Sequence, residues 1–401
     1  MELLTVPQGQ FSLSRYPRRK GELLRAWDAA DEFVLRHLAA MDALPQAPSV
    51  LIVNDSFGAI ATALAASDGF GGPTAGLGLR LSSLGDSYIA HAATEQNLAA
   101  NDIDPGAVPR LSIESPLPES VDVVVVKVPR SLSLLDDQLC RIAPHLRGTS
   151  VVVAAAMTKN IHTSTLELFD RIIGATTTSL AEKKARLIFS TVNRERPAVS
   201  SGWPKTFALD HPSAPKVIVH THAGVFAADR LDLGTRFLLD HLTHRSEAET
   251  IVDLGCGNGI FGTVCAIRNC DAEVVFVDES YMAVASAKAT FGANVGPDLR
   301  ARFIVGNGLL DLDEDTATEP LEPGSIDKVV CNPPFHVDNS VGDATAWQMF
   351  SDARHMLRPG GELWVVGNRH LAYHAKLKRL FGDCQVVAGS AKFVVLKAVR
   401  R

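Results

Sequence analysis

Asparagine followed by two prolines and an aromatic residue is the stretch of this chain best suited to chemistry on an amine. It comprises Asn332, Pro333, Pro334 and Phe335 and follows a short apolar strand expected at residues 327–330. Because proline cannot donate a backbone hydrogen bond and holds φ at about −65°, the strand must stop here. The residue before the prolines is pushed into an extended conformation. The sequence therefore predicts a stiff turn that presents an amide, carbonyl oxygens and a ring.

The four residues resemble the (Asn/Asp)-Pro-Pro-(Phe/Tyr) motif of methyltransferases that act on amino groups conjugated to a planar ring or carbonyl. Such a nitrogen is a poor nucleophile because its lone pair is delocalised. The side-chain oxygen of Asn332 and the backbone carbonyl of Pro333 can accept its two N–H bonds and direct the lone pair at a methyl group. Phe335 can stack on the base. A structural turn that merely ends a strand is the alternative interpretation.

A glycine-rich turn lies upstream, again at the end of an expected strand. Asp253 precedes it, and the turn itself contains Gly255, Gly257, Asn258 and Gly259. It resembles the first motif of class I S-adenosylmethionine methyltransferases, in which glycines let the backbone pass close to the cofactor. The following helix would offer free N–H groups to the cofactor's carboxylate. Because glycine-rich turns also bind dinucleotides, this motif is weak by itself.

Acidic residues favour S-adenosylmethionine over a dinucleotide. Asp253 comes just before the turn, where it could accept from the cofactor's ammonium group. Asp278 ends the next expected strand, where a ribose diol would lie, although it would serve either cofactor. Asn307 could meet the adenine ring, with a plain turn as the alternative, and Phe226 could either cover the cofactor or pack in a core.

The elements that must position these residues alternate between apolar strands and helices. Continuous apolar strands such as 121–126 and 251–254 are typical of a parallel, doubly wound α/β sheet covered on both faces. We expect the last strand, 393–399, to be antiparallel at or near the sheet edge. The carboxyl ends of such strands are where ligands bind.

The two halves of the chain repeat each other. Residues 53–65 align without gaps on 254–266, and 122–131 align on 327–336. In this alignment Phe57 stands where the second half has Asn258, and Lys127 stands where it has Asn332. We therefore expect two tandem Rossmann-like domains with seven-stranded sheets, of which only the second keeps a cofactor site.

Domain boundaries follow from this repeat. We expect a degenerate methyltransferase-like domain at residues 1–196 that serves as a scaffold or binds RNA, a linker at 197–215, and a catalytic domain at 216–401. The end of the first domain is locally basic. The candidates for RNA contact there are Lys183, Lys184, Arg186, Arg194 and Arg196.

Composition excludes several classes of protein. The 401 residues carry a formal charge of −6, so any contact with nucleic acid must rest on local basic patches. The chain has no stretch long and apolar enough to cross a bilayer, and its first residues do not resemble a signal peptide. The six cysteines form no Cys-x-x-Cys pair, which indicates reduced thiols in a cytoplasmic protein without a structural zinc site.

Taken together, the chain resembles the bacterial ribosomal RNA guanine-N2 methyltransferases with a duplicated domain, and within them the large-subunit enzymes. The resemblance covers nearly the whole chain and includes residues 54–59, 85–89, 161–169, 275–280, 331–336 and 392–398. It implies S-adenosylmethionine-dependent methylation of the exocyclic N2 amine of one guanosine in 23S rRNA. It also implies an inactive N-terminal copy that helps to hold RNA. The partner would be 23S rRNA or a precursor of the large subunit, and we expect a monomer without a metal.

Three other functions fit parts of the sequence. One is methylation of the same amine in 16S rRNA by an enzyme with the same duplication. Another is methylation of glutamine side chains in release factors, which also uses Asn-Pro-Pro but favours Tyr at the position of Phe335. A non-enzymatic RNA-binding or assembly factor is the third, and the intact glycine turn argues against it.

Overall fold

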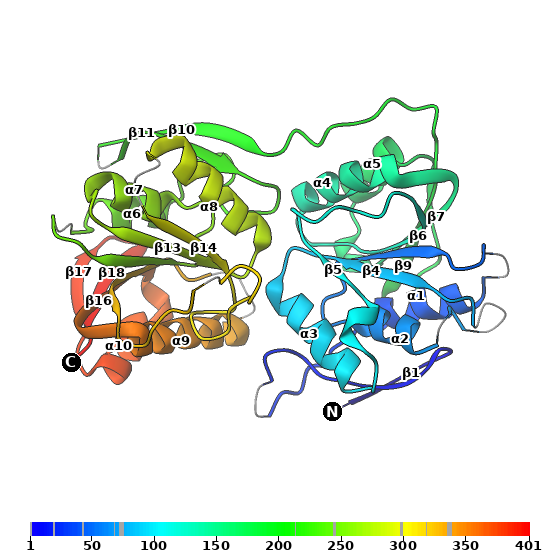
Figure 1. The fold of residues 1–401 in the computed structure, drawn as a ribbon, viewed down its shortest axis with the longest axis horizontal. Coiled ribbons are helices and arrows are strands. Elements are labelled where there is room, and N and C mark those ends of the chain that lie inside the picture. Colours follow the sequence, from blue (N-terminus) through cyan, green and yellow to red (C-terminus); the bar gives the residue numbers. More distant parts are fainter. Residues whose placement is uncertain are drawn as a thin grey trace. The chain divides into compact units, whose positions relative to one another are not determined.

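The computed structural model describes residues 2–18, 21–41, 44–67, 69–71, 76–212, 214–243, 246–296, 300–317, 319–334 and 339–401. The chain divides into two compact units, Met1–Gly202 and Trp203–Arg401. Each of these units, called here the N-terminal and the C-terminal unit, is built on its own seven-stranded sheet (Figure 1).

The sheet of the N-terminal unit has the order β5-β4-β3-β6-β7-β9-β8. Its first five strands in this order are parallel, and β9 runs antiparallel between β7 and β8. The strands are β3 (Ser49–Val53), β4 (Arg80–Leu84), β5 (Arg110–Leu111), β6 (Val121–Lys127), β7 (Leu146–Met157), β8 (Thr176–Thr178) and β9 (Ala185–Thr191).

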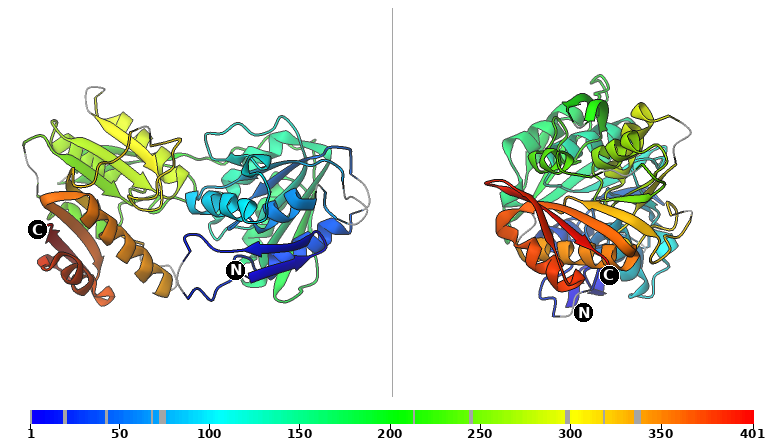
Figure 2. Two further views of the ribbon diagram at one scale, coloured as in Figure 1. Left: turned by 60° about the horizontal axis from the view of Figure 1, so that its bottom comes forward. Right: turned by 90° about the vertical axis from the view of Figure 1, so that its left-hand side faces the viewer.

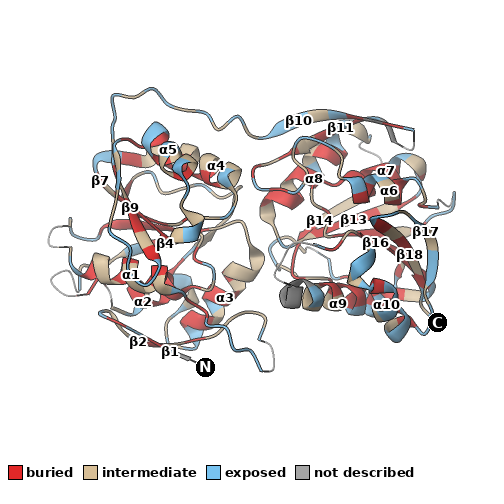
Figure 3. Cartoon of the chain, turned by 180° about the vertical axis from the view of Figure 1, so that it is seen from behind, coloured by how far each residue is buried: buried red, intermediate tan, exposed pale blue. Residues whose placement is uncertain are grey.

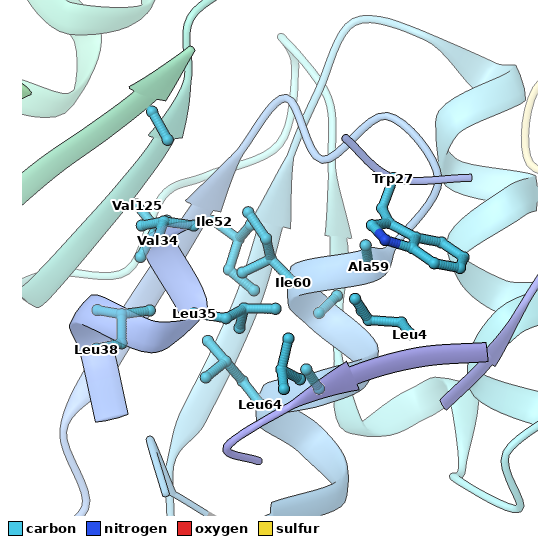
Figure 4. Packing of buried hydrophobic residues seen from close by; sticks show 14 of the residues in the cluster. Leu4, Trp27, Val34, Leu35, Leu38, Ile52, Ala59, Ile60, Leu64 and Val125 are labelled. Atoms are coloured by element: carbon cyan, nitrogen blue, oxygen red, sulfur yellow. The ribbon is translucent and has the colours of Figure 1, made fainter. Parts of the chain in front are cut away.

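Helices cover both faces of this sheet. In β3, Val50 and Ile52 join one apolar cluster, whereas Leu51 and Val53 join the other, because successive side chains of a strand point to opposite faces. The first cluster, part of which is shown in Figure 4, packs against a β1–β2 hairpin and three helices; the second packs against two helices. These elements are β1 (Glu2–Val6), β2 (Gly9–Leu13), α1 (Ala29–Ala39), α2 (Ala59–Ser67) and α3 (Tyr88–Ala99), then α4 (Leu132–Ile142) and α5 (Thr163–Ile172).

The C-terminal unit repeats this plan with the order β14-β13-β12-β15-β16-β18-β17. Most residues of the central strands are buried in each unit, as Figure 3 shows in red. The sheet strands are β12 (Thr250–Leu254), β13 (Glu273–Asp278), β14 (Ala301–Val305), β15 (Ile326–Cys331), β16 (Leu357–Asn368), β17 (Gln385–Gly389) and β18 (Phe393–Val399). One face carries the hairpin β10 (Lys205–His211) and β11 (Ala214–Thr221) with α6 (Leu233–Leu239), α7 (Ile260–Arg268) and α8 (Tyr281–Asn294); the other carries α9 (Asn339–Met356) and α10 (Tyr373–Phe381).

Equivalent asparagines hold the hairpin in each unit. Asn101 accepts from the N–H of Ser12 and donates to its carbonyl, at 2.9 and 3.0 Å. Asn294 makes the same two bonds with Ile218, at 2.7 and 2.6 Å. The hairpin of the N-terminal unit can be followed in dark blue in Figure 2. The internal repeat therefore extends to the hairpins, which the aligned segments did not include.

The fold class predicted from the sequence is confirmed, since both units have seven-stranded α/β sheets. The last strand, β18, is antiparallel and lies next to the edge strand β17, as predicted. The linker predicted at 197–215 is wrong over its second half, because residues Lys205–His211 form β10 and pair with β11. The boundary between the two compact units falls between Gly202 and Trp203, inside the first half of the predicted linker.

Candidate active site

The Asn-Pro-Pro turn follows β15, a central strand of its sheet. Strand β15 pairs in parallel with β12 on one side and β16 on the other, so the turn and the glycine turn after β12 leave neighbouring strands at the same end. Pro333 is buried and Pro334 is exposed. Phe335, predicted to stack on the base, lies outside the residues that the structure describes. The sheet thus brings the two predicted motifs together, as expected for parallel strands.

Asn332 is fixed by the start of helix α6. Its Nδ2 lies 3.1 Å from Oγ1 of Thr235 and 3.4 Å from Oδ2 of Asp232. The other end of its amide, Oδ1, is buried and has no hydrogen-bond partner among the described residues. An unsatisfied buried acceptor costs about 1–3 kcal/mol. A ligand N–H that completes this bond would recover that cost.

The three glycines of the turn have left-handed φ angles but different surroundings. Gly255, Gly257 and Gly259 have φ of +72°, +52° and +74°. A Cβ on Gly259 would lie 2.6 Å from the Cα of Ala287, so this glycine is required by the packing of α7 on α8. A Cβ on Gly257 would meet nothing within 4 Å. Open space beside Gly257 is what a cofactor that passes close to the backbone needs.

The two predicted acidic residues occupy different positions. Asp253 is only 1% exposed; its Oδ2 accepts from the N–H of Gly262 at 2.9 Å, and its Oδ1 has no partner among the described residues. Burial raises the pKa of Asp253 to about 8. Asp278 accepts from the N–H groups of Gly257 at 2.9 Å and Ser280 at 3.1 Å. Burial raises its pKa as well.

These carboxyl groups leave room for the predicted contacts. A carboxylate has about four acceptor positions, and the backbone bonds that Asp278 accepts from Gly257, Ser280 and Glu279 leave one for a ribose diol. The unpartnered Oδ1 of Asp253 suits a buried ammonium group. Both cofactor contacts stay predictions, and the residues present fit an S-adenosylmethionine at this end of the sheet.

The remaining predicted cofactor residues surround the same strand ends. Asn258 is buried and its Nδ2 lies 3.4 Å both from Oγ1 of Thr221 and from the carbonyl of Ala227, so it ties the turn to the segment after β11. Phe226, one residue earlier in that segment, is 57% exposed, which argues against a core position. Asn307 is buried, and its side chain bonds to Asp311 at 3.2 Å within a local turn.

In the N-terminal unit, side chains fill the corresponding positions. Asn54, the counterpart of Gly255, has a φ of +61°, and its amide donates to the carbonyl of Lys127 and exchanges two 2.8 Å bonds with Gln138. The guanidinium of Arg15 lies 4.8 Å from the ring centre of Phe57, the counterpart of Asn258. The positive φ is kept at Asn54 and Gly58 but not at Ser56, the counterpart of Gly257, and the side chains of Asn54 and Phe57 are engaged within the unit.

The five basic residues predicted to contact RNA do not form one group. Lys183 and Lys184 precede β9, whereas Arg194 and Arg196 follow it. Several are engaged within the unit: Lys183 pairs with Glu32 at 3.2 Å, Arg194 donates to the carbonyl of Leu146 at 2.7 Å, and Arg196 contacts Asp170. Arg186 is partly buried, with an unpartnered Nε. Lys184 is exposed. These five residues therefore do not form a single basic patch.

The described residues carry neither a metal-binding cluster nor a membrane-spanning helix. They contain no group of three or more His, Cys, Asp or Glu side chains that could hold a metal ion. Among the described helices, none is long and apolar enough to cross a membrane.

Comparison with known proteins decides the family. Residues 1–194 match the family model of the RLMG N-terminal domain, and residues 216–397 match the methyltransferase small domain. The ribosomal RNA large subunit methyltransferase G of Streptomyces avermitilis is 50% identical over 99% of both chains. The protein of the same name from Aeromonas salmonicida is 44% identical over 100% of this chain and 99% of its own.

The chain belongs to the ribosomal RNA large subunit methyltransferase G family. A solved structure, the Thermus thermophilus 16S rRNA N2 G1207 methyltransferase in complex with AdoMet and guanosine, shares the fold with a TM-score of 0.72. It covers 100% of this chain and 98% of its own, at 22% identity. The family predicted from the sequence is thus confirmed.

No individual role was predicted for Asp232 and Thr235, which lie in a segment expected only to pack over the cofactor. The pattern Asp-Leu-Gly-Thr at 232–235 carried a signal, since an aspartate before a helix is typical of an N-cap. Asp232 does cap α6, accepting from the N–H groups of Gly234 and Thr235. Its contact with Asn332 could not be read from the sequence.

Proposed function

We propose that the chain transfers a methyl group from S-adenosylmethionine to the exocyclic N2 amine of a guanosine in 23S rRNA of the large ribosomal subunit. The observation that carries this proposal is Asn332. Its oxygen is buried and has no partner among the residues that the structure describes, and β15, the strand that ends at its turn, lies beside the strand that ends in the glycine turn. The family name supports the choice of large-subunit rRNA.

The residues at the strand ends would each contact a different part of the cofactor. Gly255 and Gly257 would let the backbone pass close to the cofactor, Asp253 would accept from its ammonium, Asp278 would accept from its ribose diol, and Asn307 would lie near its adenine. When bound, the cofactor supplies an electrophilic methyl group on a sulfonium.

The residues of the turn act on the target base. A guanosine turned out of its helix or loop would place N2 where Asn332 Oδ1 and the Pro333 carbonyl each accept one N–H. Two acceptors favour a pyramidal nitrogen, whose lone pair then points away from the ring plane. Held in this way, the lone pair could form the new N–C bond as the C–S bond breaks and leaves its electrons on sulfur. The nitrogen afterwards gives one proton to solvent.

The N-terminal unit would act as a scaffold that helps to hold rRNA. The filled counterpart of the glycine turn at Asn54 and Phe57 supports a role without a cofactor. Positive charge would come from Lys184. It would also come from those residues among Lys183, Arg186, Arg194 and Arg196 that exchange their internal contacts for contacts with phosphate. The catalytic part would comprise the C-terminal unit, Trp203–Arg401, and the reaction would take place in the cytoplasm, where the ribosome assembles.

The test is made in a strain that lacks the chain, complemented with the wild type or with Asn332→Ala. N2-methylguanosine is mapped in both rRNAs. We expect one 23S position to lose the modification, to regain it with the wild type and not with the variant. Purified Asn332→Ala should still bind S-adenosylmethionine by calorimetry, because the glycine turn is intact. Loss of a 16S position instead would move the substrate to the small subunit, and wild-type turnover by the variant would remove Asn332 from the mechanism.

A further inference from the structure

The orientation of the Asn332 amide decides whether the proposed chemistry is possible. An amide side chain has an acceptor end and a donor end of nearly equal shape. With Oδ1 toward the base, Asn332 accepts from the target amine. With Nδ2 toward the base, two donors would face each other. The fold must therefore select one of the two orientations before the base arrives.

Asp232 makes this selection by its chemistry. An ionised carboxylate accepts hydrogen bonds and donates none. Its Oδ2 already receives the N–H groups of Gly234 at 2.8 Å and Thr235 at 3.0 Å, and it lies 3.4 Å from the amide of Asn332. Only the NH₂ end of that amide can face it favourably.

Thr235 links the other two side chains. Its Oγ1 lies 3.1 Å from Nδ2 of Asn332 and 3.5 Å from Oδ2 of Asp232. The hydroxyl can accept from Asn332 and donate toward Asp232. The hydrogen bonds among these three side chains therefore all run in one direction, from Asn332 to Asp232. The result is that Oδ1 of Asn332 stays buried and without a partner among the described residues.

We propose that Asp232 and Thr235 are positioning residues, which hold the acceptor end of Asn332 toward the target amine. This inference rests on the proposed function. It assigns to the first turn of α6 a part in methyl transfer that does not involve contact with the cofactor or the base.

The N-terminal unit shows the same arrangement with different chemistry. Asp28 caps α1 as Asp232 caps α6, and Asp31 follows it by three residues, as Thr235 does. These two residues hold Lys127, the counterpart of Asn332, with Nζ at 2.9 Å from Asp28 and 2.6 Å from Asp31. In both units, then, the start of this helix binds the side chain at the end of the equivalent strand, β6 or β15. Among the described residues this contact leaves the acceptor Oδ1 of Asn332 without a partner, whereas the ammonium of Lys127 has no acceptor to offer.

This arrangement explains why asparagine rather than aspartate stands at position 332. A carboxylate there would lie about 3.4 Å from that of Asp232, and like charges at such a distance repel. The substitution Asn332→Asp should therefore abolish turnover, although it keeps an acceptor at the same place.

Three variants test the proposal on rRNA extracted from a strain that lacks the chain. Asp232→Asn keeps a good N-cap but can present either end of its amide, and Thr235→Val removes the hydroxyl without changing the shape. We expect each to lower kcat by on the order of 10- to 100-fold, with KM for rRNA, the Kd of S-adenosylmethionine and the Tm unchanged. Thr235→Ser should retain most of the wild-type kcat.

A paired substitution supplies the decisive readout. Combining Asn332→Asp with Asp232→Asn removes the repulsion and gives the new carboxylate a donor, so kcat should rise at least several-fold over Asn332→Asp alone. The matched control is Thr263→Val, which should behave like the wild type. Thr263 is also buried, but unlike that of Thr235 its Oγ1 has no partner among the described residues.

Wild-type turnover in both Thr235→Val and Asp232→Asn would overturn the inference while leaving the proposed function intact. Loss of cofactor binding or of Tm in step with kcat would also overturn it, because it would show a structural role. If the wild-type chain transferred no methyl group to this rRNA, the proposed function would fail, and the inference with it.

Discussion

At the scale of single residues, Asp253 shows how the glycine turn is built over a buried carboxyl. Its Oδ2 holds the first turn of α7 through Gly262, and its Oδ1 is unpartnered among the described residues. Because burial raises its pKa to about 8, the carboxyl is mostly protonated at neutral pH in the folded chain. A cationic ammonium beside Oδ1 would lower that pKa. Binding of the cofactor would then be coupled to loss of this proton.

The raised pKa also predicts how stability depends on pH. The carboxyl binds its proton more tightly in the folded chain, about 8, than in the unfolded chain, 3.8. Its contribution to the free energy of unfolding is therefore largest below the unfolded pKa and falls as pH rises toward the folded pKa. Asparagine has no such proton to lose. Between about pH 5 and about pH 8, unfolding in urea should show a steeper loss of stability for the wild type than for Asp253→Asn.

The control for this measurement is Glu314→Gln, which changes an exposed carboxylate and should leave the pH dependence of the wild type unchanged. Parallel stability curves for Asp253→Asn and the wild type would show that the carboxyl does not hold its proton in the folded chain.

How far the sequence predicted the site depends on what each residue contacts. The Asn-Pro-Pro turn and the glycines act through local backbone conformation, so their types and spacing predicted a turn at a strand end. Asp232 and Thr235 reach Asn332 across 100 and 97 residues of sequence. Such contacts are made by the packing of α6 on the sheet, and they cannot be predicted from the spacing of residues along the chain.

At the scale of elements, the β10–β11 hairpin connects the packing of the unit to its glycine turn. Asn294, the last residue of α8, holds β11 by two bonds to Ile218. Strand β11 ends at Thr221, whose Oγ1 lies 3.4 Å from the amide of Asn258. A movement of the hairpin would therefore displace the turn that is expected to hold the cofactor.

Asn294→Ala should weaken both stability and cofactor binding. Losing two hydrogen bonds to the backbone of β11 should cost about 1–3 kcal/mol in the free energy of unfolding, and the Kd of S-adenosylmethionine should rise several-fold. Calorimetry and urea unfolding measure the two effects. Asn101→Ala, which frees the hairpin of the N-terminal unit in the same way, should lower stability without changing the Kd. An equal rise in Kd for both variants would contradict this connection.

The same hairpin marks the limit of prediction for the fold. Residues 205–211 were predicted as linker because they follow a stretch that is rich in basic residues and contains prolines. A two-stranded hairpin is marginal by itself, and β10–β11 is stabilised by contacts with α8, about 75 residues later in the chain. The central strands were predicted well because each carries its own continuous apolar signal.

At the scale of the whole molecule, duplication has kept the framework and changed the chemistry. Gly58 and Gly259 keep the same close helix contact, with a Cβ 2.6 Å from the backbone of Thr94 or of Ala287. The positions that face the open end of the sheet differ instead: Asn54 and Lys127 are tied to neighbouring side chains. The two halves share the residues that the fold requires, and they differ at the residues that the proposed catalysis requires.

This division predicts that the whole chain binds a single S-adenosylmethionine. Calorimetric titration of the wild type should give a stoichiometry of one per chain, because side chains fill the N-terminal counterpart of the site. Gly257→Ala, which puts a methyl group into the open space beside the turn, should remove most of the binding heat. Its counterpart Ser56→Ala should leave affinity and stoichiometry unchanged. A second equivalent in the wild type, or binding that survives Gly257→Ala and is lost in Ser56→Ala, would show that the N-terminal unit holds the cofactor.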